Sequence, residues 1–262
     1  FSPLQLAGVG RWSFLRNILL TIEYDGTNYH GWQRQKNAVS IQQLIEKAIE
    51  KITGSKANLI GSGRTDSGVH ALAQRANFKT EARIPAERIP FALNSCLPPD
   101  IRITGAVEMA HDFHARYDAI GKKYRYRIYN SEIPSAVHRN YSCFIPERLD
   151  IERMKEASKY ILGSRDFSSF CGSGSLAKAR VRNVELLEIE KKGKFIDIII
   201  RADGFLYNMV RIIAGTLVEV GKGSMPPHHV RDILDKRDRR FAGPTLPPQG
   251  LFLEEVYYRE DS

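Results

Sequence analysis

Residues 61–70 read GSGRTDSGVH, and this polar stretch separates apolar segments on either side. It contains three glycines, and it places Arg64 two residues before Asp66. Glycine tolerates positive φ and the close approach of a ligand or another backbone, so the pattern indicates a charge pair presented on a loop at the end of a strand. The pattern alone leaves a second interpretation open, a polar turn in which Asp66 caps its own backbone.

The segments before this stretch predict a strand and a helix. Residues 17–24, NILLTIEY, are apolar and β-branched enough for a buried strand, and the polar, aromatic segment after them reads as a long loop. Ser40 and Gln43 then form a capping-box pattern. Apolar residues follow at helical spacing: Ile41, Leu44, Ile45, Ala48, Ile49 and Ile52.

The segments after it predict strands that alternate irregularly with helices. The expected strands are 71–80, 101–110, 122–130, 180–192, 194–203 and 251–258, and the expected helices are 85–97, 150–162, 205–220 and a short one after Pro226 and Pro227. This order favours an α+β fold with a long, mostly antiparallel sheet and helices packed on one side. We expect an N-terminal extension, 1–15, and two halves, 16–111 and 112–262.

Composition suggests a polyanionic partner. The chain of 262 residues has 39 Lys and Arg against 30 Asp and Glu, a formal charge of +9, which favours nucleic acid as the partner. Its three cysteines show no C-x-x-C spacing, which fits a reducing, cytoplasmic location. No apolar run approaches the roughly 18 residues of a membrane span, so we expect a soluble protein without membrane contact.

The strand KKYRYRIY, 122–129, has two different faces. Alternation puts Tyr124 and Tyr126 on one face and Lys123 and Arg125 on the other. Aromatic faces stack unpaired bases and cationic rows follow phosphates, so this strand suits RNA. An edge strand with an aromatic core face and a charged outer face is the alternative.

An arginine interrupts the apolar stripe of the helix predicted over 205–220. Arg211 either reaches solvent along its stem or pairs with a buried carboxylate, for which Asp66 is the candidate. Nucleotide loops are not supported, because Asp66 stands where G-x-G-x-x-G requires its third glycine. The histidines lack metal-ligand spacing, so we expect neither a metal nor another cofactor.

Several ordered motifs resemble one family. YDGTNYHGWQRQ, GSGRTDSGVHA, DFHARYDAIGKKYRYRIYN, RDFSSF, FLYNMVRIIAGTLVEVG and GLFLEEVYY are similar to segments of the tRNA pseudouridine synthase A family, over residues 17–258. The resemblance implies a cofactor-free isomerase that converts uridine to pseudouridine at positions 38 to 40 of the tRNA anticodon stem-loop. It also implies a homodimer, and a fold of two similar halves with a central active-site cleft.

The resemblance also assigns roles to single residues. Asp66 matches the catalytic aspartate, and Tyr124 the tyrosine that stacks on the target base and is discussed in proton transfer. Arg64 matches the arginine associated with base flipping, and Arg211 the partner of the catalytic carboxylate. Leu251 matches an apolar residue of the uracil pocket.

Three other functions stay open at this point. A member of the family with other tRNA or RNA uridine targets is the nearest. A non-catalytic tRNA-binding or tRNA-folding protein descended from such an enzyme is the second. The third is a metal-dependent RNA hydrolase.

Overall fold

The computed structural model describes residues 15–175 and 178–259, so the expected extension, 1–15, lies outside the described residues except for Leu15. The first part of the described chain has four strands and two α-helices. These elements are β1 (Arg16–Tyr24), α1 (Ile41–Thr53), β2 (Ile60–Gly61), β3 (His70–Thr80), the 3₁₀ helix η1 (Ala86–Arg88), α2 (Ile89–Asn94) and β4 (Ile101–Met109).

The second part adds six strands and three α-helices. They are β5 (Ala119–Asn130), β6 (Cys143–Ile145), α3 (Ile151–Ser158), β7 (Gly163–Asp166), η2 (Ser168–Phe170), β8 (Val181–Lys192), β9 (Phe195–Ala202), α4 (Met209–Lys222), α5 (His229–Lys236), η3 (Arg239–Phe241), η4 (Pro248–Gly250) and β10 (Leu251–Tyr258).

Local sequence explains where the helices begin and end. α1 begins as predicted, because the Ser40 side chain accepts a hydrogen bond from the Gln43 N–H, and it ends at Gly54, whose φ is 73°. The helix predicted over 85–97 is wrong in length. It is divided into η1 and the short α2, because the proline in the first turn of α2 has no N–H to continue a helix from η1.

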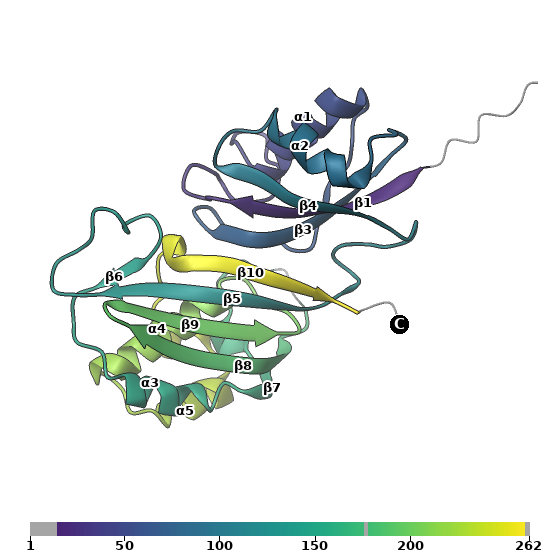
Figure 1. Cartoon of the computed structure of the whole chain (residues 1–262). Coiled ribbons are helices and arrows are strands. Elements are labelled where there is room, and N and C mark those ends of the chain that lie inside the picture. The colour runs from purple at the N-terminus through teal and green to yellow at the C-terminus, as the bar shows by residue number, and fades with distance from the viewer. Residues whose placement is uncertain (1–14, 176–177, 260–262) are drawn as a thin grey trace, which may run out of the picture.

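The strands form one mixed sheet in the order β4-β1-β3-β10-β5-β9-β8-β7, with β2 beside β3 and β6 beside β5 (Figure 1). β10, the last strand of the chain, lies between β3 and β5. It runs parallel to β3 and antiparallel to β5, and most other pairs are antiparallel. The predicted α+β fold with a long, mostly antiparallel sheet is confirmed. The division at residues 111 and 112 stays a prediction, and β10 joins the two proposed halves.

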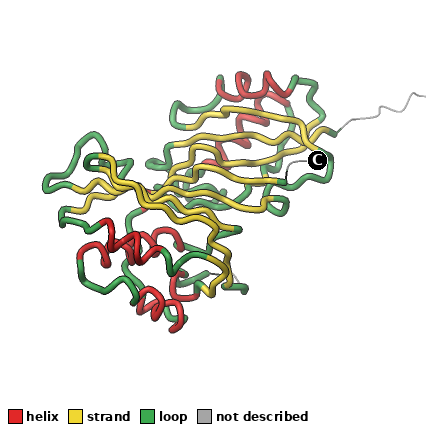
Figure 2. Tube along the Cα trace, turned by 60° about the horizontal axis from the view of Figure 1, so that its bottom comes forward, coloured by secondary structure: helices red, strands yellow, loops and turns green. Residues whose placement is uncertain are grey.

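The helices of both parts cover the same face of this sheet. The strand register places Ala71, Leu253, Tyr124 and Ile200 abreast, so their side chains share a face, and all four are buried. α1 and α2 lie along β1, β3 and β4, while α3, α4 and α5 lie along β5, β8 and β9 (Figures 1 and 2). The opposite face, here called the open face, carries half-buried polar and charged side chains.

Candidate active site

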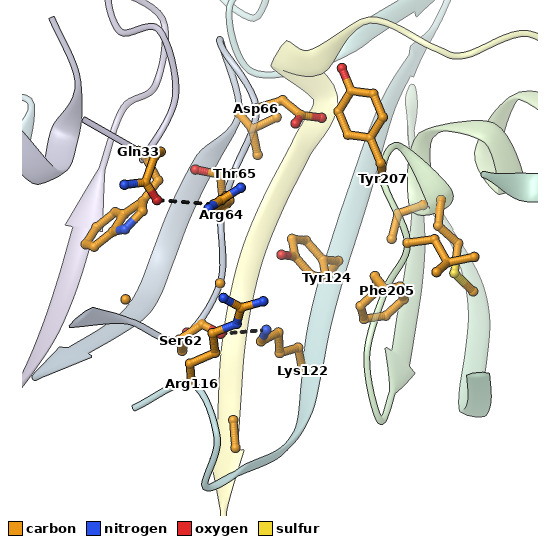
Figure 3. Close-up of a pocket in the computed structure, with 18 of the residues that line it drawn as sticks. Gln33, Ser62, Arg64, Thr65, Asp66, Arg116, Lys122, Tyr124, Phe205 and Tyr207 are labelled. Atoms are coloured by element: carbon orange, nitrogen blue, oxygen red, sulfur yellow. Dashed lines mark hydrogen bonds between the residues drawn. The ribbon is translucent and has the colours of Figure 1, made fainter. Parts of the chain in front are cut away.

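A cavity of about 760 Å³ opens on the helix-covered face where β10 meets β5. Its lining comes from the glycine-rich loop 61–66, the start of β5, the segment 203–210 that leads into α4, and Leu251 at the start of β10. Figure 3 shows Arg64 and Asp66 on the loop and Tyr124 on the strand opposite. The fold therefore brings distant parts of the sequence to one pocket.

The loop that carries Asp66 is fixed by its neighbours. The backbone N–H of Trp32 donates a hydrogen bond to the Thr65 carbonyl at 3.1 Å, and the Thr65 and Tyr24 hydroxyls lie 2.7 Å apart. Gly31 allows this approach, because a Cβ there would lie 2.5 Å from the Thr65 carbonyl oxygen and its φ is +82°. The backbone next to Asp66 is thus held before any ligand enters.

Asp66 and Arg211 are in contact. The Arg211 Nη1 lies 3.3 Å from the Asp66 Oδ2. Arg211 is itself fixed, because its Nε donates to the Leu246 carbonyl at 2.7 Å and its Nη1 donates to the Asn208 side-chain oxygen at 2.8 Å. The Arg211 side chain therefore extends from α4 to the Asp66 carboxylate and does not extend to solvent.

The environment of Asp66 combines burial with one positive charge. Burial raises the pKa of the Asp66 carboxyl above its usual value, while the charge and hydrogen bond of Arg211 act against that rise. The Asp66 side chain keeps 31% of its surface exposed. The carboxylate is therefore accessible from the cavity and is stabilised in its ionised form mainly by Arg211.

Tyr124 and Leu251 form an apolar wall of the cavity. Tyr124 is only 8% exposed, and its ring meets the ring of Phe205 edge to face at 5.1 Å between centroids. Burial, followed by the nearby Tyr24 and Asp66, raises the pKa of the Tyr124 hydroxyl well above its usual value. The hydroxyl is therefore a neutral phenol that can donate a proton or a hydrogen bond.

Arg64 extends at the rim of the cavity. Its side chain is exposed, and its Nε donates to the Gln33 side-chain oxygen at 3.1 Å. Within residues 15–175 and 178–259, no carboxylate forms an ion pair with Arg64. A cation in this position is available to a bound anion or a displaced base.

Sequence comparisons show which known proteins this chain resembles. A family model described as tRNA pseudouridine synthase matches residues 20–118 and 157–259. Proteins called tRNA pseudouridine synthase A from Thermoanaerobacter sp. (strain X514) and Acetivibrio thermocellus are each 53% identical over 244 residues, which cover 93% of this chain and 100% of each relative. The chain belongs to the tRNA pseudouridine synthase A family. It is therefore a pseudouridine synthase, an isomerase of uridine in tRNA.

Solved structures are more distant from this pseudouridine synthase. The chain compared in a structure of an H/ACA RNP bound to a substrate RNA containing 2′-deoxyuridine aligns with a TM-score of 0.36 and 11% identity, over 88% of this chain and 46% of that chain. This likeness is too weak to carry an argument about the site.

Two residues predicted to bind substrate lie away from the cavity of this synthase. Lys123 and Arg125 project from the open face of β5, opposite to Tyr124, as strand alternation requires. Lys123 Nζ lies 3.1 Å from the Glu255 carboxylate, and Arg125 Nε lies 3.1 Å from the Glu254 carboxylate. Any contact that they make with substrate must come from the open face, and this role stays a prediction.

The sequence interpretation missed several residues that line the cavity. Lys122 lies on the same face of β5 as Tyr124, and strand alternation would have indicated this. The apolar spacing predicts a continuous helix that includes Phe205 and Asn208, and this prediction is wrong at the start of the helix. Asn208 has a φ of 59°, so α4 begins only at Met209 and the preceding segment is free to line the pocket.

No group of three or more potential ligands (His, Cys, Asp or Glu) that could hold a metal ion occurs in the described part of this synthase. In the same residues, no helix has the length and apolar character needed to cross a membrane.

Proposed function

We propose that the chain isomerises uridine to pseudouridine at positions 38 to 40 of the tRNA anticodon stem-loop, with Asp66 acting at the glycosidic bond. The observation that carries this proposal is that Asp66 and Tyr124 line one cavity while Arg211 contacts the Asp66 carboxylate. Membership of the family supports tRNA as the substrate. The resemblance of the ordered sequence motifs supports the anticodon arm as the target.

The reaction rearranges bonds within one nucleotide. The bond between ribose C1′ and uracil N1 breaks, and a bond between C1′ and C5 forms. The C5 proton leaves and N1 gains a proton, so atoms and electrons balance without an added reactant. A carboxylate kept ionised by Arg211 is competent to attack the ribose or the uracil ring, or to remove a sugar proton.

The target nucleotide has to leave its stack before this chemistry begins. Flipping costs a few kcal/mol, which is the usual order for a base leaving a helix. Arg64, exposed at the rim, would occupy the space that the base vacates. Phosphate contacts to the basic protein surface offset the remaining cost.

The detached uracil has to turn without escaping. Tyr124 and Leu251 are both nearly buried, so they can hold its ring faces in a water-poor space. The neutral Tyr124 hydroxyl is available for a proton transfer during the rearrangement. These roles assign stacking and enclosure to the apolar wall and bond cleavage to Asp66.

The test is pseudouridine formation by the purified protein. Tritium release from tRNA labelled at uracil C5, followed by mapping of the product, is expected to show pseudouridine at one or more of positions 38 to 40. Pseudouridine found only at other positions would show that the enzyme acts on uridines outside the anticodon arm. Binding without tritium release would indicate a non-catalytic protein, and strand cleavage that a chelator stops would indicate a hydrolase.

We further propose that the enzyme acts in the cytoplasm as a homodimer, which the family resemblance supports. Light scattering after gel filtration is expected to give twice the mass of one chain. A single-chain mass at the concentrations used for activity would contradict the dimer and leave the chemistry unaffected.

A further inference from the structure

Lys122 is a lysine directed into the cavity. It lies two residues before Tyr124 on β5 and on the same face of the strand, and its Nζ donates a hydrogen bond to the Ser62 carbonyl at 2.8 Å (Figure 3). A Cβ on Gly63 would lie 2.7 Å from this Nζ, so the glycine leaves room for the amine. The amine therefore sits between β5 and the loop that carries Asp66.

Lys122 has no negative partner where it lies. In the described chain, neither Lys122 nor Arg116 takes part in an ion pair, although both line the cavity. The two carboxylates of the cavity lining are engaged elsewhere: Asp66 contacts Arg211, and Asp203 accepts a hydrogen bond from the Asn183 N–H at 3.0 Å. Two cations thus share one side of the pocket, and neither forms an ion pair within the described residues.

The adjacent lysine shows that a lysine on β5 can have a carboxylate partner. Lys123 is the same residue type on the same strand, and it contacts Glu255 on the open face. Lys122, in contrast, is mostly enclosed, and burial together with the charge of Arg116 lowers the pKa of its amine to about 8. Enclosing a charge without a partner is unfavourable, and an incoming anion would remove that cost.

We propose that Lys122 and Arg116 form a phosphate-binding subsite that holds a backbone phosphate next to the uridine being isomerised. The proposal rests on the proposed function, which supplies an RNA nucleotide to this pocket. Phosphate is the anion that every such nucleotide carries, and an ammonium beside a guanidinium is a suitable donor set for it.

The spacing along β5 fits this assignment. Residues two apart on a strand are about 6.6 Å apart, so Lys122 lies about one such step from the ring on which the base would stack. Asp66 lies across the cavity on the glycine-rich loop (Figure 3). The base and the phosphate would then lie next to each other along β5, and the reacting sugar would face Asp66 on the opposite wall. Lys122 acts in this scheme as a positioning residue that aligns the sugar with Asp66.

The first experiment measures tRNA affinity as a function of salt for Lys122→Met, with Lys155→Met as the control. The logarithm of the association constant falls with the logarithm of the salt concentration, and the steepness of that fall reports the number of phosphate contacts. Losing one such contact in Lys122→Met is expected to reduce the steepness by about 0.7. Lys155→Met is expected to keep the wild-type slope, because Lys155 pairs with Glu152 on α3 and does not line the cavity. Equal slopes for wild type and Lys122→Met, or equal losses in both variants, would overturn the subsite.

Arg116→Met and Lys122→Arg keep the test decisive if Lys122→Met folds poorly. Arg116 is exposed, so its replacement should not disturb folding, and it is expected to reduce the slope as well. Lys122→Arg keeps the charge and is expected to restore the slope. A wild-type slope in Arg116→Met together with no recovery in Lys122→Arg would assign Lys122 a purely structural role.

The second experiment neutralises the phosphate itself. A methylphosphonate placed on the 5′ or the 3′ side of the target uridine is expected to weaken binding by the wild type at one of the two positions and to cause no further loss in Lys122→Met. Equal additional losses in both proteins would contradict the proposal. If the wild type modifies a uridine outside the anticodon arm, the proposed function fails, and the subsite is tested at the phosphates of that uridine.

Discussion

At the scale of single residues, the site depends on how Arg211 is held. Hydrogen bonds to the Leu246 carbonyl and to Asn208 fix the guanidinium independently of Asp66. The positive charge beside the carboxylate is therefore in place before substrate binds. Such preorganisation is the main way that enzymes stabilise charge without rearranging during the reaction.

Removing the charge of Arg211 is expected to change the pH dependence of activity. Arg211 opposes the rise that burial causes in the pKa of Asp66, so Arg211→Met raises that pKa further. Because the ionised carboxylate is the active form, the acid limb of the profile of kcat/KM against pH moves to higher pH. The maximum value of kcat/KM is expected to fall roughly 100-fold, which is the usual effect of removing one group that stabilises charge in the transition state.

Arg211→Lys is the control for this change, since it keeps the charge and loses the planar contacts. Its acid limb should stay nearer to the wild-type position than that of Arg211→Met. Tritium release measured across the acid range reports both profiles. An acid limb that does not move in Arg211→Met would show that Arg211 does not control the ionisation of Asp66.

Tyr124→Phe separates stacking from proton transfer. The ring and its edge-to-face contact with Phe205 should remain, so tRNA affinity is expected to stay within a few-fold of wild type. If the hydroxyl moves a proton, kcat falls by roughly 10²- to 10⁴-fold. Single-turnover rates give the answer, and an unchanged rate would reduce Tyr124 to a stacking surface.

At the residue scale, local patterns narrowed the choices without deciding them. The small, polar loop suggested that Asp66 is presented to a ligand, and the side chain is half-buried at the cavity. The arginine inside an apolar helix left solvent and a carboxylate open for Arg211, and the structure shows contact with the carboxylate of Asp66. Lys122 was missed even though alternation places it on the face of Tyr124. The enclosure of Lys122 depends on a loop from another part of the chain, which alternation within one strand cannot indicate.

At the scale of elements, the start of α4 shapes the pocket. Asn208 adopts the left-handed conformation, with a φ of 59°, immediately before the helix. This conformation breaks the helix that the apolar spacing predicts from Phe205, and it directs the Asn208 side chain to Arg211. Periodicity could not indicate the break, because asparagine is compatible with a helical pattern and is also one of the few non-glycine residues that adopt the left-handed conformation.

Replacements of Asn208 are expected to separate backbone strain from the contact with Arg211. Asn208→Ala should be less stable than Asn208→Gly by about 1 kcal/mol, because alanine disfavours positive φ. Both variants lose the hydrogen bond to Arg211, so both should lose activity to a similar degree. Urea denaturation and kcat/KM are the measurements, and equal stability of the two variants would contradict the role assigned to the backbone.

Prediction of the other elements depended on their length. Long periodic segments such as α1 and β5 were placed within one to three residues of their observed ends. β2, β6 and β7 were missed, because strands of two to four residues show no recognisable alternation. Their pairing is decided by neighbouring strands that are distant in sequence.

At the scale of the whole molecule, β10 holds the sheet together. The last strand enters between β3 and β5, and Leu253 on it is 1% exposed. The α+β class and the mostly antiparallel sheet were predictable from the order of elements. The central position of β10 was not, because pairing between strands so far apart leaves no local signal.

Leu253→Ala is expected to lower the free energy of unfolding by about 2 to 5 kcal/mol, the usual cost of emptying a buried leucine site. Because the sheet is continuous, the variant should still unfold in one transition. Leu72→Ala is the matched control: Leu72 lies on the neighbouring β3 and is exposed, so its replacement should change stability by no more than about 0.5 kcal/mol. Two separate transitions in Leu253→Ala would show that the two parts fold independently.

The central claim is that Asp66 performs the chemistry, and Asp66→Asn tests it most directly. The amide has nearly the same shape as the carboxylate and cannot act as the nucleophile or the base. Pseudouridine is measured in a single turnover with enzyme in excess over labelled tRNA, beside the affinity of the same variant for that tRNA. The account predicts affinity within a few-fold of wild type and no pseudouridine above background. Appreciable product from Asp66→Asn would contradict it.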